Sequence, residues 1–233
     1  MKFSKMHGIG NDYVYVNGFK EKIDNPEEVS IFVSDRRKGI GSDGLIMILP
    51  SEVADCRMRM FNADGSEGMM CGNGIRCVGK YAYDNGIVNK PELSVETKSG
   101  IKYITLQIEN GVAVGATVDM GKAILKPSDI PMNADGENFI AKPIEVDGKE
   151  YTTTCVSMGN PHCIIFMNSD PMKMNLPEIG AKFENHPIFP EKVNTEFVQV
   201  LDEHTIFMRV WERGSGETFA CGTGACAVAV ATA

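Results

Sequence analysis

The chain has 233 residues, of which 43% are hydrophobic and 23% charged, as is typical of a globular protein with one large domain or two lobes. Its formal net charge is −8 and its longest basic cluster is Arg36-Arg37-Lys38, which excludes nucleic acids and anionic membranes as expected partners. No apolar run reaches the roughly 18 residues that span a membrane, and no signal-peptide core follows Met1. A cytoplasmic protein is therefore expected.

The first half alternates strand-like and helical stretches. Residues 3–16 read as strands around a Gly8-Ile9-Gly10-Asn11 turn, and the apolar spacing of residues 26–36 predicts a short amphipathic helix. Asn85-Gly86 ends a predicted helix at 75–83, and the turns Ser99-Gly100 and Asn110-Gly111 separate strands. The expected strands are 45–49, 56–61, 93–97, 101–108 and 112–120.

The second half repeats this plan loosely. Strands are expected within 145–166, with Asp147-Gly148 as a turn, and a short helix is expected at 179–186. Further strands are expected at 197–200 and 205–211. A final helix at 225–233 consists almost entirely of Ala, Val and Cys, and a helix with no polar face is expected to be buried.

One motif occurs twice. Glu67 lies four residues before Cys71, which Gly72-Asn73-Gly74 follows; in the same way Glu217 lies four residues before Cys221, which Gly222-Thr223-Gly224 follows. The two cysteines are 150 residues apart, and the pairs Gly10-Asn11 and Gly159-Asn160 are 149 apart. The repeat predicts a duplicated unit with one cysteine per copy.

The predicted fold class is therefore α+β. We expect two pseudo-symmetric lobes, residues 1–118 with Cys71 and 119–233 with Cys221, each a mostly antiparallel mixed sheet curled around a central buried helix. The strands at 93–120 should recur near 243–270, beyond residue 233, so the sequence predicts an incomplete second lobe and a protein about 40 residues longer.

The repeated motif suits proton transfer at carbon. A thiol at a helix N-terminus lies near unpaired N–H groups and the positive end of the helix dipole, which predicts a lowered thiol pKa. The same N–H groups can bind a carboxylate, and they stabilise the charge that forms when the adjacent carbon loses its proton. Two such thiols, on opposite faces of one carbon, can act as general base and general acid. This chemistry needs no cofactor and no metal, and Gly39-Ile40-Gly41-Ser42-Asp43-Gly44 is only superficially like a dinucleotide-binding motif.

Six segments together resemble the diaminopimelate epimerase family, pyridoxal-independent enzymes of lysine and peptidoglycan precursor synthesis. The segments are Phe3-Ser4-Lys5-Met6-His7-Gly8-Ile9-Gly10-Asn11-Asp12, Phe61-Asn62-Ala63-Asp64-Gly65-Ser66-Glu67, Cys71-Gly72-Asn73-Gly74-Ile75-Arg76-Cys77, Ser157-Met158-Gly159-Asn160-Pro161-His162-Cys163, Phe189-Pro190-Glu191-Lys192-Val193-Asn194 and the run from Glu212 to Cys226. The resemblance implies epimerisation of LL-diaminopimelate to the meso form, and it is compatible with a homodimer. One departure is Gly44, where some family members have Gln, so any side-chain contact there is lost.

The resemblance also implies roles for individual residues. Cys71 and Cys221 would form the acid/base pair, and His162 and Glu212 would assist thiol deprotonation. An amino-acid substrate would be bound by the following residues: Asn11, Asn62, Gly72, Asn73, Asn160, Asn194, Glu212, Arg213, Gly222 and Thr223. Arginine suits bidentate binding of a distal carboxylate.

Simpler interpretations remain for several of these residues. The four asparagines could be turn residues, His162 could be a structural histidine, and Glu67 and Glu217 could bond within their own loops. The remaining cysteines are expected in the core: Cys56, Cys77, Cys155, Cys163 and Cys226.

Two other functions stay open. A related racemase or isomerase of the same fold could act on another amino acid, such as proline or hydroxyproline. More remotely, Cys71 and Cys221 could belong to a thiol redox or zinc-binding protein, although the seven cysteines include no Cys-x-x-Cys pair.

Overall fold

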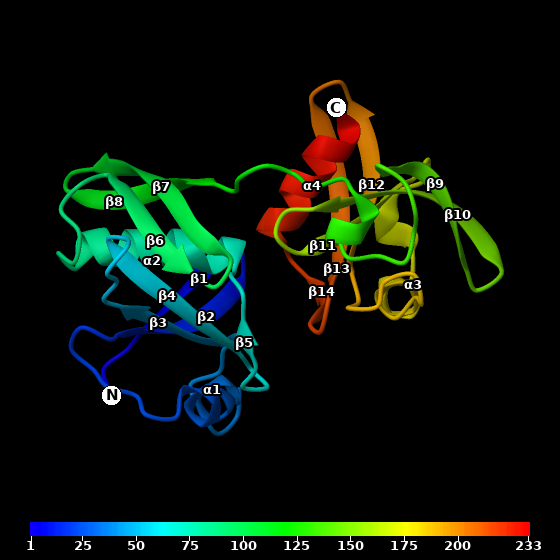
Figure 1. Cartoon of the computed structure of the whole chain (residues 1–233). Helices are drawn as coiled ribbons and strands as arrows, with labels where there is room; N and C mark the ends of the chain where they lie inside the picture. Colours follow the sequence, from blue (N-terminus) through cyan, green and yellow to red (C-terminus); the bar gives the residue numbers. More distant parts are fainter. The chain divides into compact units, whose positions relative to one another are not determined.

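The computed structural model describes all residues, Met1–Ala233, and the chain divides into two compact units, Met1–Met120 and Gly121–Ala233 (Figure 1). Each unit combines one mixed sheet with helices, which confirms the predicted α+β class. None of the helices combines the length and apolarity that crossing a membrane requires.

The N-terminal unit is an eight-stranded sheet in the order β1-β2-β3-β4-β6-β7-β8, with β5 paired to β4. The β2–β3 and β4–β6 pairs are parallel and the other pairs are antiparallel. The strands are β1 Ser4–Gly8, β2 Asn11–Asn17, β3 Gly44–Leu49, β4 Cys56–Asn62, β5 Glu67–Gly68, β6 Glu92–Thr97, β7 Gly100–Glu109 and β8 Val112–Asp119; the helices are α1 Pro26–Ser34 and α2 Gly72–Asp84.

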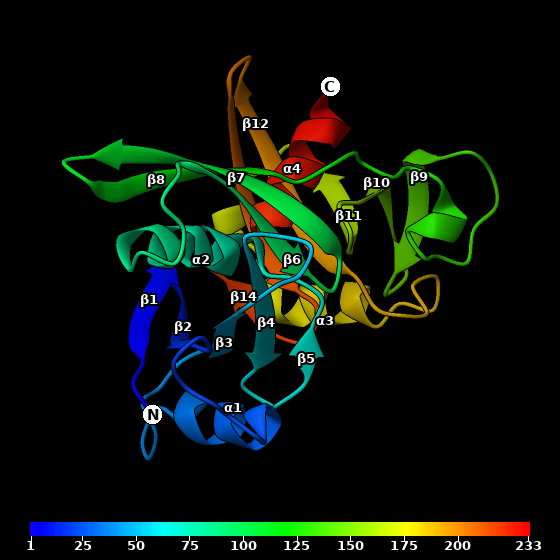
Figure 2. The same ribbon diagram turned by 60° about the vertical axis from the view of Figure 1, so that its left-hand side comes forward.

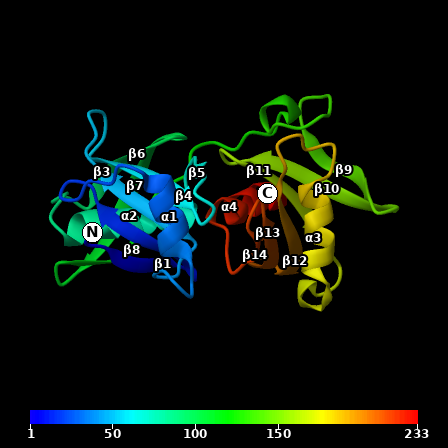
Figure 3. The same cartoon turned by 90° about the horizontal axis from the view of Figure 1, so that it is seen from below.

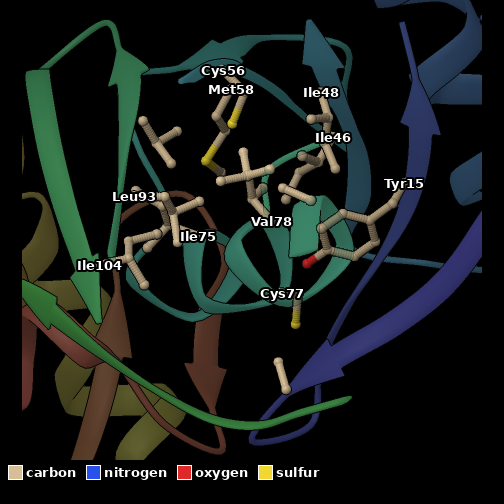
Figure 4. Close-up of a cluster of buried hydrophobic side chains, with 14 of the residues drawn as sticks. Tyr15, Ile46, Ile48, Cys56, Met58, Ile75, Cys77, Val78, Leu93 and Ile104 are labelled. Atoms are coloured by element: carbon tan, nitrogen blue, oxygen red, sulfur yellow. The ribbon is translucent and has the colours of Figure 1, made fainter. Parts of the chain in front are cut away.

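Alternate residues of the central strands belong to two different apolar clusters, one on each face of the sheet. Tyr15, Ile46 and Ile48 point toward α2, and Figure 4 shows them around Val78 of that helix. The intervening residues of β2 and β3, such as Val14, pack on the α1 side. This period of two is what a sheet covered on both faces requires. Figure 2 shows the β7–β8 hairpin beside α2, which packs against β8.

The C-terminal unit is a six-stranded sheet in the order β14-β13-β12-β11-β10-β9, in which only β11 and β12 pair in parallel. Helices α3 and α4 lie on opposite faces of this sheet (Figure 3). The strands are β9 Phe139–Val146, β10 Lys149–Ser157, β11 Pro161–Phe166, β12 Asn194–Asp202, β13 Thr205–Glu212 and β14 Gly216–Thr218; the helices are α3 Leu176–Glu184 and α4 Gly222–Thr232, with short 3-10 turns η1 Pro127–Asp129 and η2 Pro171–Lys173.

The α3 side of this sheet holds the main apolar cluster of the unit, which includes Phe183 and Phe197. Trp211 of β13 packs against it, and its indole Nε1 donates to Glu184 Oε2 at 2.7 Å. A Cβ at Gly180 of α3 would lie 2.6 Å from the Trp211 ring, so the absence of a side chain there lets the indole lie flat on the helix.

The two units share their strand registers. Tyr13 pairs with Gly44 across β2 and β3, as His162 pairs with Asn194 across β11 and β12. With the further pairs of β3–β4 and β12–β13, this register makes Ile46 equivalent to Glu196 and Asn62 equivalent to Glu212. The duplication predicted from the two cysteine motifs therefore extends through the strands beneath them.

Helix α4 is not buried all round, contrary to the prediction from its apolar sequence. Ala225 and Ala229 are exposed and Cys226 is only half-buried, so Cys226 is not a core residue; the other four cysteines predicted for the core are buried. The physical reason is that β6, β7 and β8, which lie with α2 in the N-terminal unit, have no counterpart over α4.

Candidate functional site

Both repeated cysteines occupy the N-cap of a helix. The backbone angles are φ −124° and ψ 115° at Cys71, and φ −118° and ψ 117° at Cys221. Each Sγ accepts a hydrogen bond from the N–H three residues later, of Gly74 at 3.3 Å and of Gly224 at 3.4 Å. The thiol thus takes the place of the hydroxyl that usually caps a helix.

In the N-terminal unit, a polar chain leads from the surface to Cys71. The Cys71 thiol donates to Asn11 Oδ1 at 3.3 Å, and Asn11 Nδ2 donates to Asp43 Oδ2 at 2.9 Å. Arg36 donates to the other oxygen of Asp43, also at 2.9 Å. The Asp43 carboxylate therefore fixes the Asn11 amide with its oxygen toward the thiol, since only the NH₂ group can donate to a carboxylate.

The residues beneath the start of α2 are apolar or uncharged. The hydroxyl of buried Tyr15 donates to the Gly74 carbonyl at 3.4 Å, and burial, with the nearby Cys77, raises its pKa. A Cβ at Gly74 would lie 2.6 Å from Ile46 Cδ1, so the isoleucine fills the space directly under the helix.

In the C-terminal unit, a different polar chain leads to Cys221. Its Sγ lies 3.3 Å from Thr223 Oγ1, and Thr223 accepts from Asn160 Nδ2 at 3.2 Å. Asn160 Oδ1 lies 3.1 Å from His162 Nε2, and His162 Nδ1 lies 2.7 Å from Glu196 Oε1. The predicted residues His162, Asn160, Thr223 and Cys221 are therefore brought together.

Glu196, at the end of this hydrogen-bonded series, was not predicted from the sequence. Its side chain and that of His162 are 0% exposed, and Glu196 Oε2 has no hydrogen-bond partner. A glutamate within a strand reads as a solvent-facing residue, so composition gives no signal. The register of the repeat could have identified it, because the equivalent position in the first unit is the buried Ile46.

The predicted lowering of the thiol pKa is wrong for Cys221. Burial raises the pKa of this thiol well above its usual value, and the charges of Glu212 and Glu196 raise it further. Hydrogen bonds from Thr223 and from the Gly224 N–H oppose this effect but are outweighed. Desolvation, which depends on the folded structure, therefore dominates the helix-terminus effect that the sequence suggested.

Glu212 lies on the same side of the sheet as Cys221. Burial raises the pKa of its carboxyl group, the charge of Glu196 adds to the increase, and a hydrogen bond from Thr218 Oγ1 opposes it. The nearby Cys221 thiol also opposes the increase through a hydrogen bond.

The other predicted binding residues are held by local structure. Asn194 donates to the Pro161 carbonyl at 2.8 Å and accepts from the Arg213 N–H at 2.9 Å, while the Arg213 side chain donates to the Glu191 carbonyl at 2.9 Å. Asn62 donates to Ser66 Oγ within a turn. Gly72, Asn73, Gly222 and Thr223 form the first turns of α2 and α4.

The glycine at position 44 fits a close backbone approach. A Cβ there would lie 2.0 Å from the Phe61 carbonyl oxygen and 2.8 Å from the Tyr13 ring. The backbone of this chain therefore leaves no room for a side chain at this position.

Glu67 and Glu217 form equivalent ion pairs within their units. Arg59 donates to Glu67 at 2.7 Å, and Arg209 donates to Glu217 at 2.8 Å. Each glutamate pairs with an arginine of the neighbouring strand, which agrees with the simpler interpretation that it bonds locally.

Three neighbouring side chains have donor atoms of the kinds that bind metal ions. Single donor atoms of His162, Glu196 and Cys221 all lie within 4.8 Å of one another. However, His162 Nδ1 and Glu196 Oε1 are bonded to each other at 2.7 Å, closer than two ligands of one tetrahedral ion, about 3.3 Å apart for bonds near 2.0 Å. As arranged, the group is a hydrogen-bonded cluster rather than a metal cage.

One cavity of the C-terminal unit lies away from these residues. It has a volume of about 750 Å³ and lies between the β9–β10 hairpin and α3, with Tyr151 and Phe197 in its wall. None of the predicted site residues lines it.

Comparisons with known proteins identify the family. The sequence matches the family described as "Diaminopimelate epimerase" over residues 3–126 and 154–233. It is 58% identical to the diaminopimelate epimerase of Acetivibrio thermocellus over 232 residues, covering 100% of this chain and 82% of the relative. It is 55% identical to that of Methanococcus maripaludis, covering 100% of this chain and 83% of the relative.

Solved structures show the same fold at low sequence identity. A hydroxyproline epimerase from Agrobacterium vitis superposes with a TM-score of 0.66 at 16% identity, covering 99% of this chain and 75% of that one. A PhzF-family phenazine biosynthesis protein from Bacillus anthracis has a TM-score of 0.62 at 18% identity, with coverages of 98% and 77%.

Proposed function

The chain belongs to the diaminopimelate epimerase family, and on this premise we propose that Cys71 and Cys221 carry out a two-base epimerisation of LL-diaminopimelate to the meso form. The observation that carries the proposal is the duplicated N-cap thiol, with nearly identical backbone angles in two separate units. The protein is an amino-acid epimerase that acts on a small molecule.

The reaction moves one proton off carbon and another one on. The thiolate of one cysteine removes the Cα proton, and the thiol of the other delivers its proton to the opposite face of the same carbon. The substrate is then inverted, and the two sulfurs have exchanged protonation states. Proton exchange with solvent restores the starting state, so the cycle balances without an oxidant or reductant.

The charge that develops on the substrate carboxylate needs donors. The N–H groups of a helix's first turn point away from the helix, and here they belong to Gly72-Asn73 and Gly222-Thr223. Donors of this kind, directed at a developing oxyanion, stabilise the transition state more than the ground state.

The remaining predicted residues divide into two proposed roles. His162 and Glu212 assist proton transfer at Cys221, which is supported by their position around that thiol. Arg213 binds the distal carboxylate, and Asn11, Asn62, Asn160 and Asn194 form the polar surroundings of the substrate. We also propose a cytoplasmic location, supported by the odd number of cysteines.

Solvent-deuterium incorporation tests the proposal. Purified protein is incubated with LL-diaminopimelate in D₂O without added cofactor, and the product is analysed by mass spectrometry and chiral chromatography. We expect meso product that carries one deuterium at the inverted carbon. Failure of the wild-type protein to exchange the Cα proton would overturn the proposed function.

Two controls separate the rival functions. L-Proline and trans-4-hydroxy-L-proline should show no exchange under the same conditions, and exchange with either would favour a related racemase. Prior treatment with a metal chelator should leave the exchange rate unchanged, since the proposed step uses only thiols.

A further inference from the structure

The two proposed catalytic thiols have matching backbones but different neighbours beneath them. Ile46 lies under the helix that begins at Cys71, whereas Glu196 occupies the equivalent position under the helix that begins at Cys221. Resting on the proposed function, we propose that Glu196 is a positioning residue: it holds the His162 ring so that this ring receives the proton that Cys221 releases.

The geometry makes Glu196 the fixed end of a continuous chain. The distances from Glu196 to His162, Asn160, Thr223 and the Cys221 sulfur are 2.7, 3.1, 3.2 and 3.3 Å in turn. Two strands, the turn before β11 and helix α4 contribute to this series, and its first three residues belong to the β11–β12 pair and that turn. A carboxylate buried in this way holds the histidine ring in one orientation, with a hydrogen on Nδ1.

The donors and acceptors of the chain specify where protons can be. Because the Asn160 NH₂ group donates to Thr223, the Asn160 amide oxygen faces His162 Nε2. This oxygen can only accept, so a hydrogen bond between the two atoms needs a hydrogen on Nε2. In the same way, the hydrogen bond to Glu196 Oε1 needs a hydrogen on His162 Nδ1. The ring is therefore set to hold two protons, and the Thr223 hydrogen is left to donate to the Cys221 sulfur.

The complementary arrangement needs only a half-turn of the Asn160 amide. With a single ring proton on Nδ1, still held by Glu196, Nε2 accepts from the NH₂ group and Thr223 accepts from the Cys221 thiol. The two arrangements differ by one transferred proton: thiol and neutral imidazole become thiolate and imidazolium. The charge of the cluster is the same in both, and single donor atoms of Cys221, His162 and Glu196 all lie within 4.8 Å of one another.

The Glu196 carboxylate acts on both His162 and Cys221, and the contact distances decide which of the two effects is larger. Glu196 makes a direct hydrogen bond to His162 at 2.7 Å, whereas it acts on Cys221 through its charge alone. A charge-assisted hydrogen bond is the stronger interaction. Glu196 therefore acts on the pair mainly by holding the His162 ring, although its charge by itself disfavours the Cys221 thiolate.

The sequence around Glu196 provides the space for it. A Cβ at Gly224 would lie 2.5 Å from Glu196 Oε1, so the third residue of α4 has to lack a side chain for the carboxylate to lie there. Thr195, which precedes Glu196 on the strand, is equally buried and has an unpartnered hydroxyl. Its side chain lies on the opposite face of the sheet.

The test measures each thiol separately in the Glu196→Gln variant. Purified wild-type and variant proteins are alkylated briefly with iodoacetamide between about pH 6 and about pH 9, and the Cys71 and Cys221 peptides are quantified by mass spectrometry. We expect alkylation of Cys221 near pH 8 to fall about 10-fold while that of Cys71 is unchanged, and kcat to fall about 100-fold with KM within about 3-fold.

The controls separate positioning from folding. Thr195→Val removes a buried hydroxyl from the same strand and should leave kcat and both alkylation rates unchanged. Glu196→Asp keeps the carboxylate charge but moves it away from His162, and should give an intermediate kcat. This variant also tests the inference if Glu196→Gln does not fold. Wild-type kcat in Glu196→Gln, or equal loss of reactivity at both cysteines, would overturn the inference. Alkylation needs no substrate, so this result is independent of whether the protein epimerises diaminopimelate.

Discussion

The surroundings of Cys71 and Cys221 differ far more than their backbones do. Both thiols cap a helix with almost the same dihedral angles and accept from an equivalent glycine N–H. Yet the Cys71 thiol donates to an asparagine oxygen, whereas Cys221 contacts a hydroxyl at the end of a histidine–glutamate chain. The comparison shows that duplication retained the backbone that places sulfur at a helix terminus, while the residues that control its proton diverged.

The comparison first predicts that neither thiol can substitute for the other. Cys71→Ser and Cys221→Ser should each lower kcat by at least about 10³-fold, because a serine hydroxyl caps the helix but does not ionise at neutral pH. Steady-state epimerase assays would measure this. Cys226→Ser on the half-buried side of α4 is the matched control and should retain full activity; substantial activity in either N-cap variant would contradict the two-thiol mechanism.

The second prediction contrasts Gly44 with its counterpart Asn194. Gly44→Ala should lower the free energy of unfolding by about 3 kcal/mol, because the new Cβ would meet the Phe61 carbonyl, a backbone atom that cannot easily move. Asn194→Ala should cost about 1–2 kcal/mol, through loss of its hydrogen bonds to Pro161 and Arg213. Urea unfolding would measure both, and equal effects would refute the distinction.

The third prediction concerns the equivalent glycines of the two helices. Gly224→Ala should displace the Glu196 carboxylate and lower kcat about 10-fold, whereas Gly74→Ala meets only the flexible end of Ile46 and should leave kcat within about 3-fold. Activity assays on both variants, with unfolding curves to confirm folding, would test this. A larger loss in Gly74→Ala would reverse the proposed difference between the two sites.

The smallest predicted effect depends on pH. Hydrogen bonds and charges of Arg36 and Lys5 outweigh burial and lower the pKa of Asp12 to about 2, from 3.8; Pro161 stands at the equivalent position after Asn160. Because the folded-state pKa is the lower one, the stabilisation is complete above 3.8 and is lost as the pH falls through about 2. Asp12→Asn should cost about 1 kcal/mol at neutral pH, since more than half of Arg36 is exposed and water screens the pair.

Urea unfolding of wild-type and Asp12→Asn proteins at several pH values would measure this loss. The difference between the two proteins should disappear toward pH 2, whereas a difference that does not change with pH would show that the charge of Asp12 is not its source.

Sequence patterns predicted those features that depend on neighbouring residues. The turns Asn110-Gly111 and Asp147-Gly148 have positive φ at both positions, as two-residue hairpins require, and Asn85 ends α2 as expected. Helix α3 begins earlier than predicted because Pro177 is compatible with the first turn. The two-residue strand β5 and the short β14 were not predicted, since both form only by pairing with the strand before them.

The features that sequence could not predict depend on long-range burial. The helix terminus of Cys221 was visible in the sequence, but its burial and the two carboxylates that raise its pKa were not, since the carboxylates come from two different strands, β12 and β13, brought to the start of α4 by folding. In the same way, the apolar sequence of α4 suggested a buried helix, but burial depends on which strands cover it.

Trp211 is the only tryptophan of the chain, and it lies in the C-terminal unit, one residue before Glu212. Five of the six tyrosines lie in the N-terminal unit, the exception being Tyr151. Selective excitation of the indole therefore reports on one unit, whereas tyrosine signals report mainly on the other. Following both signals during denaturation shows directly whether the two units lose their structure in one cooperative step or independently.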